Sequence, residues 1–358
     1  MISIHEQAAA NGFVTGWLTL ASPRTLNALT LEMAVAARAQ LEAWACRDDV
    51  ACIVLQGEGR AFCAGGDVRR MRLGILAGDD YCERFFGQEY RLDYAIHRYP
   101  KPVLAWGHGV VMGGGLGLLV GASHRVVTGS TRCAMPETSI GLYPDVGASH
   151  FLNRLPPGLG LFLGITGCEW NGADAVALGL ADYLLDDLAR DALPGLLANA
   201  GWAADADHNR RLLAGLLQAL PAACTTPRLA PHLQTLADSC NVPLASAVAN
   251  LQQLAIPEDW FTHALENLAR GCPVTARIVE EQLRRGRSLG LADAFRMEWT
   301  LSVQCCRHPD FPEGVRAQLV DKDKQPRWRF PSIAAVPDDY IAAHFVQPVT
   351  NHPLADLA

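Results

Sequence analysis

The segment AMPETSIGLYPDVGAS, residues 134–149, places two acidic side chains in an otherwise apolar stretch rich in proline and glycine. Glu137 and Asp145 stand eight residues apart. Two neighbouring carboxyl groups in a pocket that excludes water can have different pKa values, because it is unfavourable for both to be ionised at short range. One acid can then attack a carbonyl carbon or activate a water while the other keeps a proton. The structural alternatives are a carboxylate that caps a helix or turn for Glu137, and a turn residue after proline for Asp145.

Two glycine-rich loops supply further candidate groups. GRAFCAGGD (59–67) and GHGVVMGGGLG (107–117) each follow an apolar strand pattern. Glycine permits positive φ and lets the backbone approach a ligand with no Cβ in the way. One N–H group from each loop, aimed at the same oxygen, would form an oxyanion hole that stabilises charge on an acyl oxygen. A glycine turn is more commonly a packing feature, so neither loop is specific by itself.

Other chemistries fit these segments less well. The glycine triplet does not complete the GxGxxG fingerprint of dinucleotide sites, and the chain has no GxSxG nucleophile elbow. Cys63 is a candidate thiol nucleophile, but no histidine is near it in the sequence, which favours a buried structural thiol. The eleven histidines occur singly, without HxxxH or HxH spacing, so no metal site is predicted.

The composition is that of a globular protein. The 358 residues are half hydrophobic, which is enough to bury a large core. The net charge of -7 argues against a nucleic-acid or anionic-membrane partner. Eleven cysteines without a CxxC pair indicate a reducing compartment, and the first residues resemble neither a signal nor a transit peptide. We therefore expect a cytoplasmic protein.

The apolar stretch 103–122 is long enough for a membrane span. It contains seven glycines, however, which would make a poor spanning helix. The pattern favours a buried strand that turns through glycine into a packed helix. No membrane partner is therefore expected.

Strands and helices alternate through the first half of the chain. Helices are predicted at 29–44, 79–97 and 113–121, and strands at 13–20, 51–56, 101–106, 124–127 and 133–135. This alternation predicts α/β architecture. From about residue 188 the pattern becomes helical and proline-punctuated, followed by an ordered tail. We expect a core with the active site at 1–195 and a mainly helical region at 196–358.

Five segments together resemble the crotonase superfamily of enoyl-CoA hydratases and isomerases, and within it the 3-hydroxyisobutyryl-CoA hydrolase branch. They are SPRTLNALTLEM (22–33), AFCAGGD (61–67), GHGVVMGGGLGL (107–118), MPETSIGLYPDVG (135–147) and DFPEGVRAQLVDKDKQPRW (310–328). The resemblance covers residues 10 to 345, and the last two segments are the most specific to the hydrolase branch. It implies a crotonase-like spiral of ββα units with a C-terminal helical region.

The resemblance implies a catalytic role for four residues. Gly66 and Gly114 would supply the two oxyanion N–H groups that bind the thioester carbonyl. Glu137 would be the main catalytic carboxylate, acting as a nucleophile through a mixed anhydride or as a base for water. Asp145 would assist beside it.

The resemblance also implies a set of substrate-binding residues. Glu89, in the preceding helix, would contact the 3-hydroxyl of the acyl group, with a solvated surface acid as the alternative. Candidates for the phosphates of coenzyme A are Arg24 near the first loop, the arginines of the VRRMR run (68–72), and Lys322 with Lys324 in the tail. Arg69, Arg70 and Arg72 form a charge run, which is usually a solvated helix face. The full predicted binding set is Glu89, Gly66, Gly114, Arg24, Ala64 and Asp67.

One departure from the family pattern separates two reactions. Enoyl-CoA hydratases carry a second glutamate three residues after the middle glycine, and this chain has Gly117 there. The resemblance therefore favours hydrolysis of 3-hydroxyisobutyryl-CoA, in valine breakdown, over hydration or isomerisation of an enoyl-CoA. A catalytically silent acyl-CoA binder is a third hypothesis. Coenzyme A would enter as part of the substrate, with no separate cofactor, and the family implies a homo-oligomer, a trimer or a dimer of trimers.

Overall fold

The structure is a computed structural model that describes all 358 residues. Contacts divide the chain into two compact units. The first comprises Met1–Gly66, Arg91–Cys133 and Trp170–Ala230, and the second Asp67–Tyr90, Ala134–Glu169 and Pro231–Ala358. This interleaved division differs from a single boundary near residue 195. The change of composition there marks where helices become frequent, but the first of those helices pack on the sheet of the first unit.

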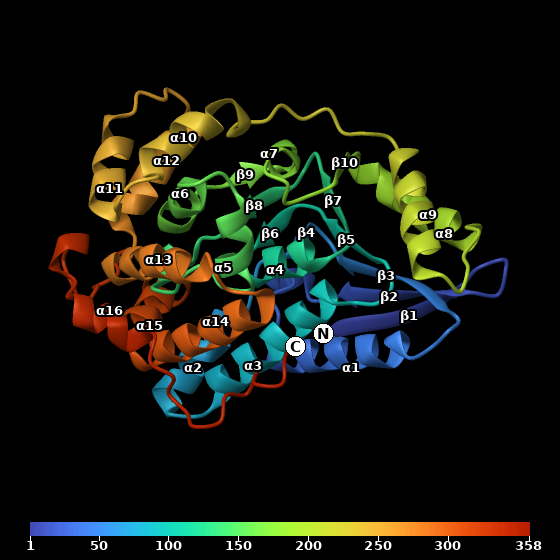
Figure 1. Ribbon diagram of the computed structural model, residues 1–358, viewed down its shortest axis with the longest axis horizontal. Coiled ribbons are helices and arrows are strands. Elements are labelled where there is room, and N and C mark those ends of the chain that lie inside the picture. The colour runs from blue at the N-terminus through green and yellow to red at the C-terminus, as the bar shows by residue number, and fades with distance from the viewer. The chain divides into compact units, whose positions relative to one another are not determined.

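The first unit is built around a six-stranded sheet of order β1-β2-β3-β5-β7-β10 (Figure 1). β1 and β2 are antiparallel, and every other neighbouring pair is parallel. The strands are β1 (Ile2–Ala8), β2 (Val14–Leu20), β3 (Val50–Gly57), β5 (Val103–Gly107), β7 (His124–Thr128) and β10 (Tyr183–Leu185). β3 is buried along nearly its whole length, which explains its continuous apolar sequence.

A smaller sheet positions the glycine loops. Its order is β4 (Ala61–Cys63), β6 (Val110–Met112), β8 (Arg132–Ala134) and β9 (Trp170–Asn171). β4 and β6 are parallel neighbours, so their carboxyl ends meet at the same edge of the sheet. The loops that follow these two strands therefore begin side by side.

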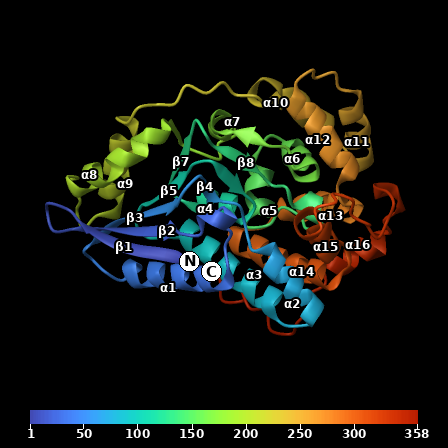
Figure 2. The same ribbon diagram turned by 180° about the vertical axis from the view of Figure 1, so that it is seen from behind.

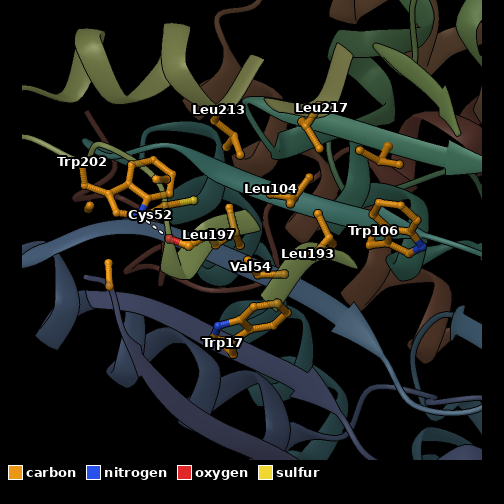
Figure 3. Close-up of a cluster of buried hydrophobic side chains, with 14 of the residues drawn as sticks. Trp17, Cys52, Val54, Leu104, Trp106, Leu193, Leu197, Trp202, Leu213 and Leu217 are labelled. Atoms are coloured by element: carbon orange, nitrogen blue, oxygen red, sulfur yellow. Dashed lines mark hydrogen bonds between the residues drawn. The ribbon is translucent and has the colours of Figure 1, made fainter. Parts of the chain in front are cut away.

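Helices cover the large sheet of the first unit. They are α1 (Leu31–Ala45), α4 (Gly114–Gly121), α7 (Gly172–Ala177), α8 (Leu193–Ala198) and α9 (Ala206–Gln218), with the 3₁₀ turns η1 (Pro23–Thr25) and η4 (Asp187–Ala192). Figure 3 shows leucines of α8 and α9 packed against strand residues such as Leu104 and Trp106. Trp202 closes this core and donates its indole N–H to Leu197 O at 2.9 Å. Burial of each such leucine contributes about 2 kcal/mol.

The second unit is almost entirely helical (Figure 2). Its α-helices are α2 (Val68–Ala77), α5 (Ala148–Phe151), α6 (Leu159–Thr166), α10 (Leu233–Cys240), α11 (Leu244–Gln253), α12 (Asp259–Arg270), α13 (Pro273–Gly286), α14 (Leu291–Arg307), α15 (Asp310–Val315) and α16 (Asp338–His344). Short turns are η2 (Glu137–Ile140), η3 (Leu152–Arg154), η5 (Ala230–His232), η7 (Ile333–Ala335) and a π-helical turn, η6 (Arg316–Val320). α3 (Tyr81–His97) contributes residues to both units.

The sequence predicted most elements of the first half. The expected helix at 79–97 is α3, and the expected strands at 51–56 and 124–127 are β3 and β7. The apolar stretch 103–122 forms β5, β6 and α4, and no helix in the protein combines the length and hydrophobicity needed to cross a bilayer. Several elements were not predicted, among them β1, α2 and the short strands β4 and β6 of the smaller sheet. The start of α2 is capped by Asp67, whose carboxylate accepts the Arg70 N–H at 3.1 Å.

Candidate active site

The two glycine loops contact each other within the first unit. Gly65 has a φ of +98°, and a Cβ built on it would lie 3.3 Å from the Gly114 nitrogen. A Cβ on Gly115 would lie 2.3 Å from the carbonyl oxygen of Cys63. Side chains at these positions would push the loops apart, so glycine is required for the approach.

Gly66 and Gly114 present N–H groups that no other group in the protein uses. Gly114 is the first residue of α4, and the first N–H groups of a helix have no partner within it. Neither the Gly66 nor the Gly114 N–H donates a hydrogen bond in the structure. Both predicted oxyanion residues are therefore in adjacent loops with a donor to offer.

Three other residues near these loops have different environments. Ala64 is half-buried, and its N–H donates to Leu26 O at 3.0 Å, which leaves the loop backbone ordered. Arg24 is exposed on η1 and makes no ion pair. Cys63 is fully buried, and its thiol donates to Asn27 O at 3.2 Å, as expected for a structural thiol. The substrate-binding roles of Arg24 and Ala64 stay predictions.

The acidic pair lies within the second unit, and both carboxyl groups are buried. Glu137 begins η2, and its Oε2 has no hydrogen-bond partner, although its carboxyl group forms a hydrogen bond with its own backbone. Burial, and then the neighbouring Asp145, raise the pKa of Glu137 well above its ordinary value. Burial also raises the pKa of Asp145 to about 6, against the lowering effect of a hydrogen bond from Tyr90. Two acids with perturbed pKa values and one unused oxygen fit a reactive site.

Asp145 is held by the Tyr90 hydroxyl of α3, which is itself in contact with a hydroxyl group of α14. The Tyr90 hydroxyl oxygen of α3 lies 2.6 Å from Asp145 Oδ2, and Ser302 Oγ of α14 lies 2.6 Å from the same phenol oxygen. The rings of Tyr90 and Phe295 pack with centroids 5.8 Å apart, which fixes α3 against α14. Asp145 is thus oriented by side chains far from it in the sequence.

The backbone that carries Asp145 is strained and is fastened by Glu298. Val146 has a φ of +52°, a conformation that costs a β-branched residue on the order of 1–3 kcal/mol. The fully buried Glu298 accepts N–H groups from Gly147 at 2.7 Å and Ser149 at 2.8 Å, one on each oxygen. Burial raises the pKa of Glu298 to about 8, although these N–H groups favour its charged form. Glu298 therefore holds the turn that presents Asp145.

Four residues of this cluster were missed by the sequence interpretation, namely Tyr90, Tyr143, Glu298 and Ser302. Glu298 offered one usable signal, because it lies on the apolar face of a helix pattern that includes Ala294, Leu301 and Cys305. The tyrosines and the serine offered none, because buried hydroxyls are common in helical segments.

The remaining predicted residues are also in the second unit. Glu89 is buried, so the alternative of a solvated surface acid is wrong. Asp67 caps α2, and its predicted substrate contact stays a prediction. The three arginines of α2 have protein partners. Arg69 donates to Leu319 O, Arg72 donates to Pro312 O, and Arg70 pairs with Asp79.

No group of three or more histidine, cysteine, aspartate or glutamate side chains is arranged to hold a metal ion. The first unit offers the two backbone N–H groups of Gly66 and Gly114, and the second unit offers carboxyl and hydroxyl groups. Such groups can bind an acyl oxygen, attack a carbonyl carbon and transfer a proton.

Comparison with known proteins places the chain in a family. The family model described as enoyl-CoA hydratase/isomerase matches residues 15–345. The chain belongs to this family. Its α/β architecture and its glycine loops are those expected from the crotonase resemblance.

Curated members of the enoyl-CoA hydratase/isomerase family narrow the relationship to the 3-hydroxyisobutyryl-CoA hydrolase branch. The chicken (Gallus gallus) protein named "3-hydroxyisobutyryl-CoA hydrolase, mitochondrial" is 36% identical over 95% of this chain and 88% of its own length. The human protein of the same name is 36% identical, over 92% and 86%. An Arabidopsis thaliana protein named "Probable 3-hydroxyisobutyryl-CoA hydrolase 2" is 32% identical, over 92% and 88%.

Solved structures of family members share the fold. A structure described as an enoyl-CoA hydratase from Rhodobacter sphaeroides is 33% identical and has a TM-score of 0.84, over 97% of both chains. A structure described as a carnitinyl-CoA dehydratase from Mycobacterium thermoresistibile is 32% identical and has a TM-score of 0.85, over 98% of both chains. The crotonase-like fold predicted from the sequence is confirmed.

The expected cytoplasmic location is contradicted by these relatives, because the animal hydrolases carry the word mitochondrial in their names. All eleven cysteines are free in the structure. Free thiols indicate a reducing environment but do not tell one reducing compartment from another. The composition therefore could not support the cytoplasmic assignment.

Proposed function

We propose that this protein hydrolyses the thioester of 3-hydroxyisobutyryl-CoA to 3-hydroxyisobutyrate and coenzyme A, a step of valine breakdown. The observation that carries the proposal is the buried pair Glu137 and Asp145, in a chain 36% identical to proteins named for this hydrolysis. Coenzyme A arrives with the substrate, and the reaction uses no other cofactor.

The N–H groups of Gly66 and Gly114 act on the carbonyl oxygen of the thioester. Charge develops on this oxygen as the carbonyl carbon becomes tetrahedral, and two preoriented donors stabilise it without reorganisation. The free N–H groups of the two adjacent loops support this role.

Glu137 supplies the attacking group. Its carboxylate either adds to the carbonyl carbon, so that loss of the thiolate leaves a mixed anhydride for water to cleave, or takes a proton from an attacking water. The unpartnered Oε2 supports either route, because no protein group competes for that oxygen. Asp145 protonates the leaving sulfur.

Binding of the substrate involves residues around these groups. Glu89 binds the 3-hydroxyl of the acyl group, and its burial supports a role in a polar contact. Arg24, which is exposed and has no ion pair, binds a phosphate of coenzyme A. Ala64 and Asp67 line the path of the substrate. The protein works as a homo-oligomer, a trimer or a dimer of trimers, which light scattering would measure.

A screen of acyl-CoA thioesters tests the proposal. Thiol release would be followed with a chromogenic disulfide across saturated, unsaturated and 3-hydroxylated acyl groups, and hydration of crotonyl-CoA would be followed by the loss of enoyl absorbance. We expect the highest kcat/KM for 3-hydroxyisobutyryl-CoA and negligible hydration, because position 117 is glycine. Rapid hydration with no thiol release would replace the hydrolase by the hydratase. Binding without either reaction would show a silent acyl-CoA binder.

A further inference from the structure

A continuous chain of hydroxyl groups leads away from Asp145 in the second unit. The Tyr90 hydroxyl oxygen lies 2.6 Å from Asp145 Oδ2 and 2.6 Å from Ser302 Oγ. Ser302 Oγ lies 2.8 Å from the Tyr143 hydroxyl, which donates to the backbone oxygen of Glu298 at 2.6 Å. All of these groups are buried, so they must satisfy one another.

Each of the four contacts is short enough to require a hydrogen between its two oxygens. The three hydroxyl groups carry only three hydrogens. The carbonyl of Glu298 can only accept, so the Tyr143 hydrogen is committed to it. An ionised Asp145 can also only accept, which commits the Tyr90 hydrogen. The single hydrogen of Ser302 then has to serve its contacts with both Tyr90 and Tyr143. One of these two short oxygen pairs therefore has no hydrogen between its atoms.

A proton on Asp145 removes this conflict. The carboxyl O–H then donates to Tyr90, Tyr90 donates to Ser302, Ser302 donates to Tyr143, and Tyr143 donates to the Glu298 carbonyl. Four hydrogens serve four contacts, and all of them point in one direction. Hydrogen bonds aligned in this way strengthen one another in a low-dielectric interior.

We propose that Tyr90, Ser302 and Tyr143 are positioning residues that keep a proton on Asp145 for delivery to the sulfur of the leaving group. The inference rests on the thioester hydrolysis proposed above. When the carbon–sulfur bond breaks, its electron pair stays on sulfur and the Asp145 proton moves to it, which gives the free thiol. The carboxylate that remains accepts from Tyr90. In the anhydride route, the water that cleaves the anhydride returns a proton to Asp145. In the water-activated route, the proton that Glu137 takes from the water passes to Asp145.

The surroundings of Asp145 favour the same protonation state. The titratable groups that interact with Asp145 are acids, phenols and a thiol: Glu137, Glu298, Tyr90, Tyr143 and Cys305. Another acid, Glu89, acts on Tyr90. None of these groups carries a positive charge that would stabilise an Asp145 carboxylate. Burial raises the pKa of Asp145 to about 6, although its hydrogen bonds with Tyr90 and with the backbone lower it.

Ser302→Ala is the decisive variant. It removes the group with one hydrogen for two contacts, so an ionised Asp145 no longer leaves an unsatisfied pair. The alkaline limb of the kcat profile should move to lower pH by roughly one unit, with KM within about twofold of the wild-type value. If Ser302 only supported Tyr90 as a donor to a carboxylate, the limb would move to higher pH. An upward shift, or none, overturns the inference.

Thr300→Val is the matched control. Thr300 is also a buried hydroxyl residue of α14, but it bonds to the Arg296 carbonyl and lies outside the chain. Its removal should leave the position of the alkaline limb unchanged. Ser302→Thr keeps the hydroxyl and should restore the wild-type limb, even if its extra methyl lowers kcat.

A spectroscopic measurement separates this inference from the proposed function. The protonated Asp145 carboxyl would be followed by its infrared band in the Glu137→Gln variant, and the band would be assigned by its loss on Asp145→Asn. Its intensity would then be measured against pH in Glu137→Gln and in Glu137→Gln with Ser302→Ala. We expect the band to persist to higher pH when Ser302 is present. If the wild-type enzyme released no thiol from any acyl-CoA, the proposed function would fail, and this titration would still decide whether the chain holds the proton. A band insensitive to Ser302 contradicts the inference.

Discussion

The glycine loops of the first unit present backbone N–H groups, whereas the acidic pair of the second unit presents side-chain carboxyl groups. Gly66 and Gly114 act through the backbone, and their value depends on side chains being absent. Glu137 and Asp145 act through side chains, and Asp145 depends on partners from α3 and α14. A backbone donor should therefore be lost only by changing the glycine itself. A buried carboxyl should be disturbed by residues far from it in the sequence, such as Tyr90 and Ser302.

The largest expected effect is at Glu137. Glu137→Gln keeps the shape of the side chain but removes the nucleophile or base, and we expect kcat to fall by roughly a thousandfold or more. Binding of coenzyme A should persist, because the substituted group is buried away from solvent and uncharged variants avoid the cost of burying an ion. Thiol release and calorimetric binding measure the two quantities. A variant with wild-type turnover would exclude Glu137 from the chemistry.

Gly114 tests the backbone half of the comparison. It is the first residue of α4, where proline fits the helix and the missing N–H costs no intrahelical bond. Gly114→Pro should therefore remove the oxyanion donor and lower kcat by about 10²–10³. Gly114→Ala keeps the N–H and serves as the matched control, with a smaller loss. Equal activity of the two variants, with circular dichroism unchanged, would show that this N–H does not serve the carbonyl oxygen.

The two regions also differ in how far the sequence predicted them. The glycine loops could be predicted because the glycines are visible in the local sequence, next to strands whose apolar runs are easily recognised. Glu137 and Asp145 stood out because acids are rare among apolar residues. The α/β fold class could be predicted from the alternation of strands and helices. The spiral of ββα units was predicted only from the family resemblance.

The partners of Asp145 could not be predicted because they are defined by three-dimensional contact. Ser302 is 157 positions from Asp145 in the chain, and nothing in its local sequence distinguishes it from a solvent-exposed helical serine. The interleaving of the two units has the same origin, since contacts between distant segments leave no periodic pattern. Helix α2 was missed because its charged first turn followed directly from a glycine turn.

Asp145 provides a test on stability. Its pKa rises from the ordinary 3.8 to about 6, so the folded state prefers the protonated form. The resulting penalty is absent below pH 3.8, grows as the pH rises and is complete above pH 6, so the stability of Asp145→Asn relative to wild type should rise by about 3 kcal/mol between these limits. Urea unfolding at pH 4 and pH 8 measures this difference. Asp49→Asn should behave oppositely, because Arg47 lowers the pKa of Asp49.

Glu298 tests whether the strained turn depends on one carboxylate. At pH 9, above its pKa of about 8, Glu298 is ionised and each of its oxygens accepts a backbone N–H, from Gly147 and Ser149, so Glu298→Gln places an amide NH₂ against one of these donors. We expect the free energy of unfolding to fall by about 2 kcal/mol and kcat to fall with it. Glu281→Gln is the control, since this residue pairs with Arg284 and Arg285 near the surface and should cost less than about 1 kcal/mol. Equal losses would remove the special role of Glu298.

The smallest effect is expected at Arg24, where binding is electrostatic and exposed. A surface contact to a phosphate contributes roughly 0.2–1 kcal/mol, so Arg24→Ala should raise KM for the coenzyme A thioester by a few-fold at most. The increase should shrink with added salt, because exposed charges are screened. A thioester of N-acetylcysteamine has no phosphates, so its KM should not change. Arg38→Ala, which removes a surface arginine paired with Glu42, is the control. If Arg24→Ala raised KM equally for the two thioesters, Arg24 would support the structure of its loop and would not bind a phosphate.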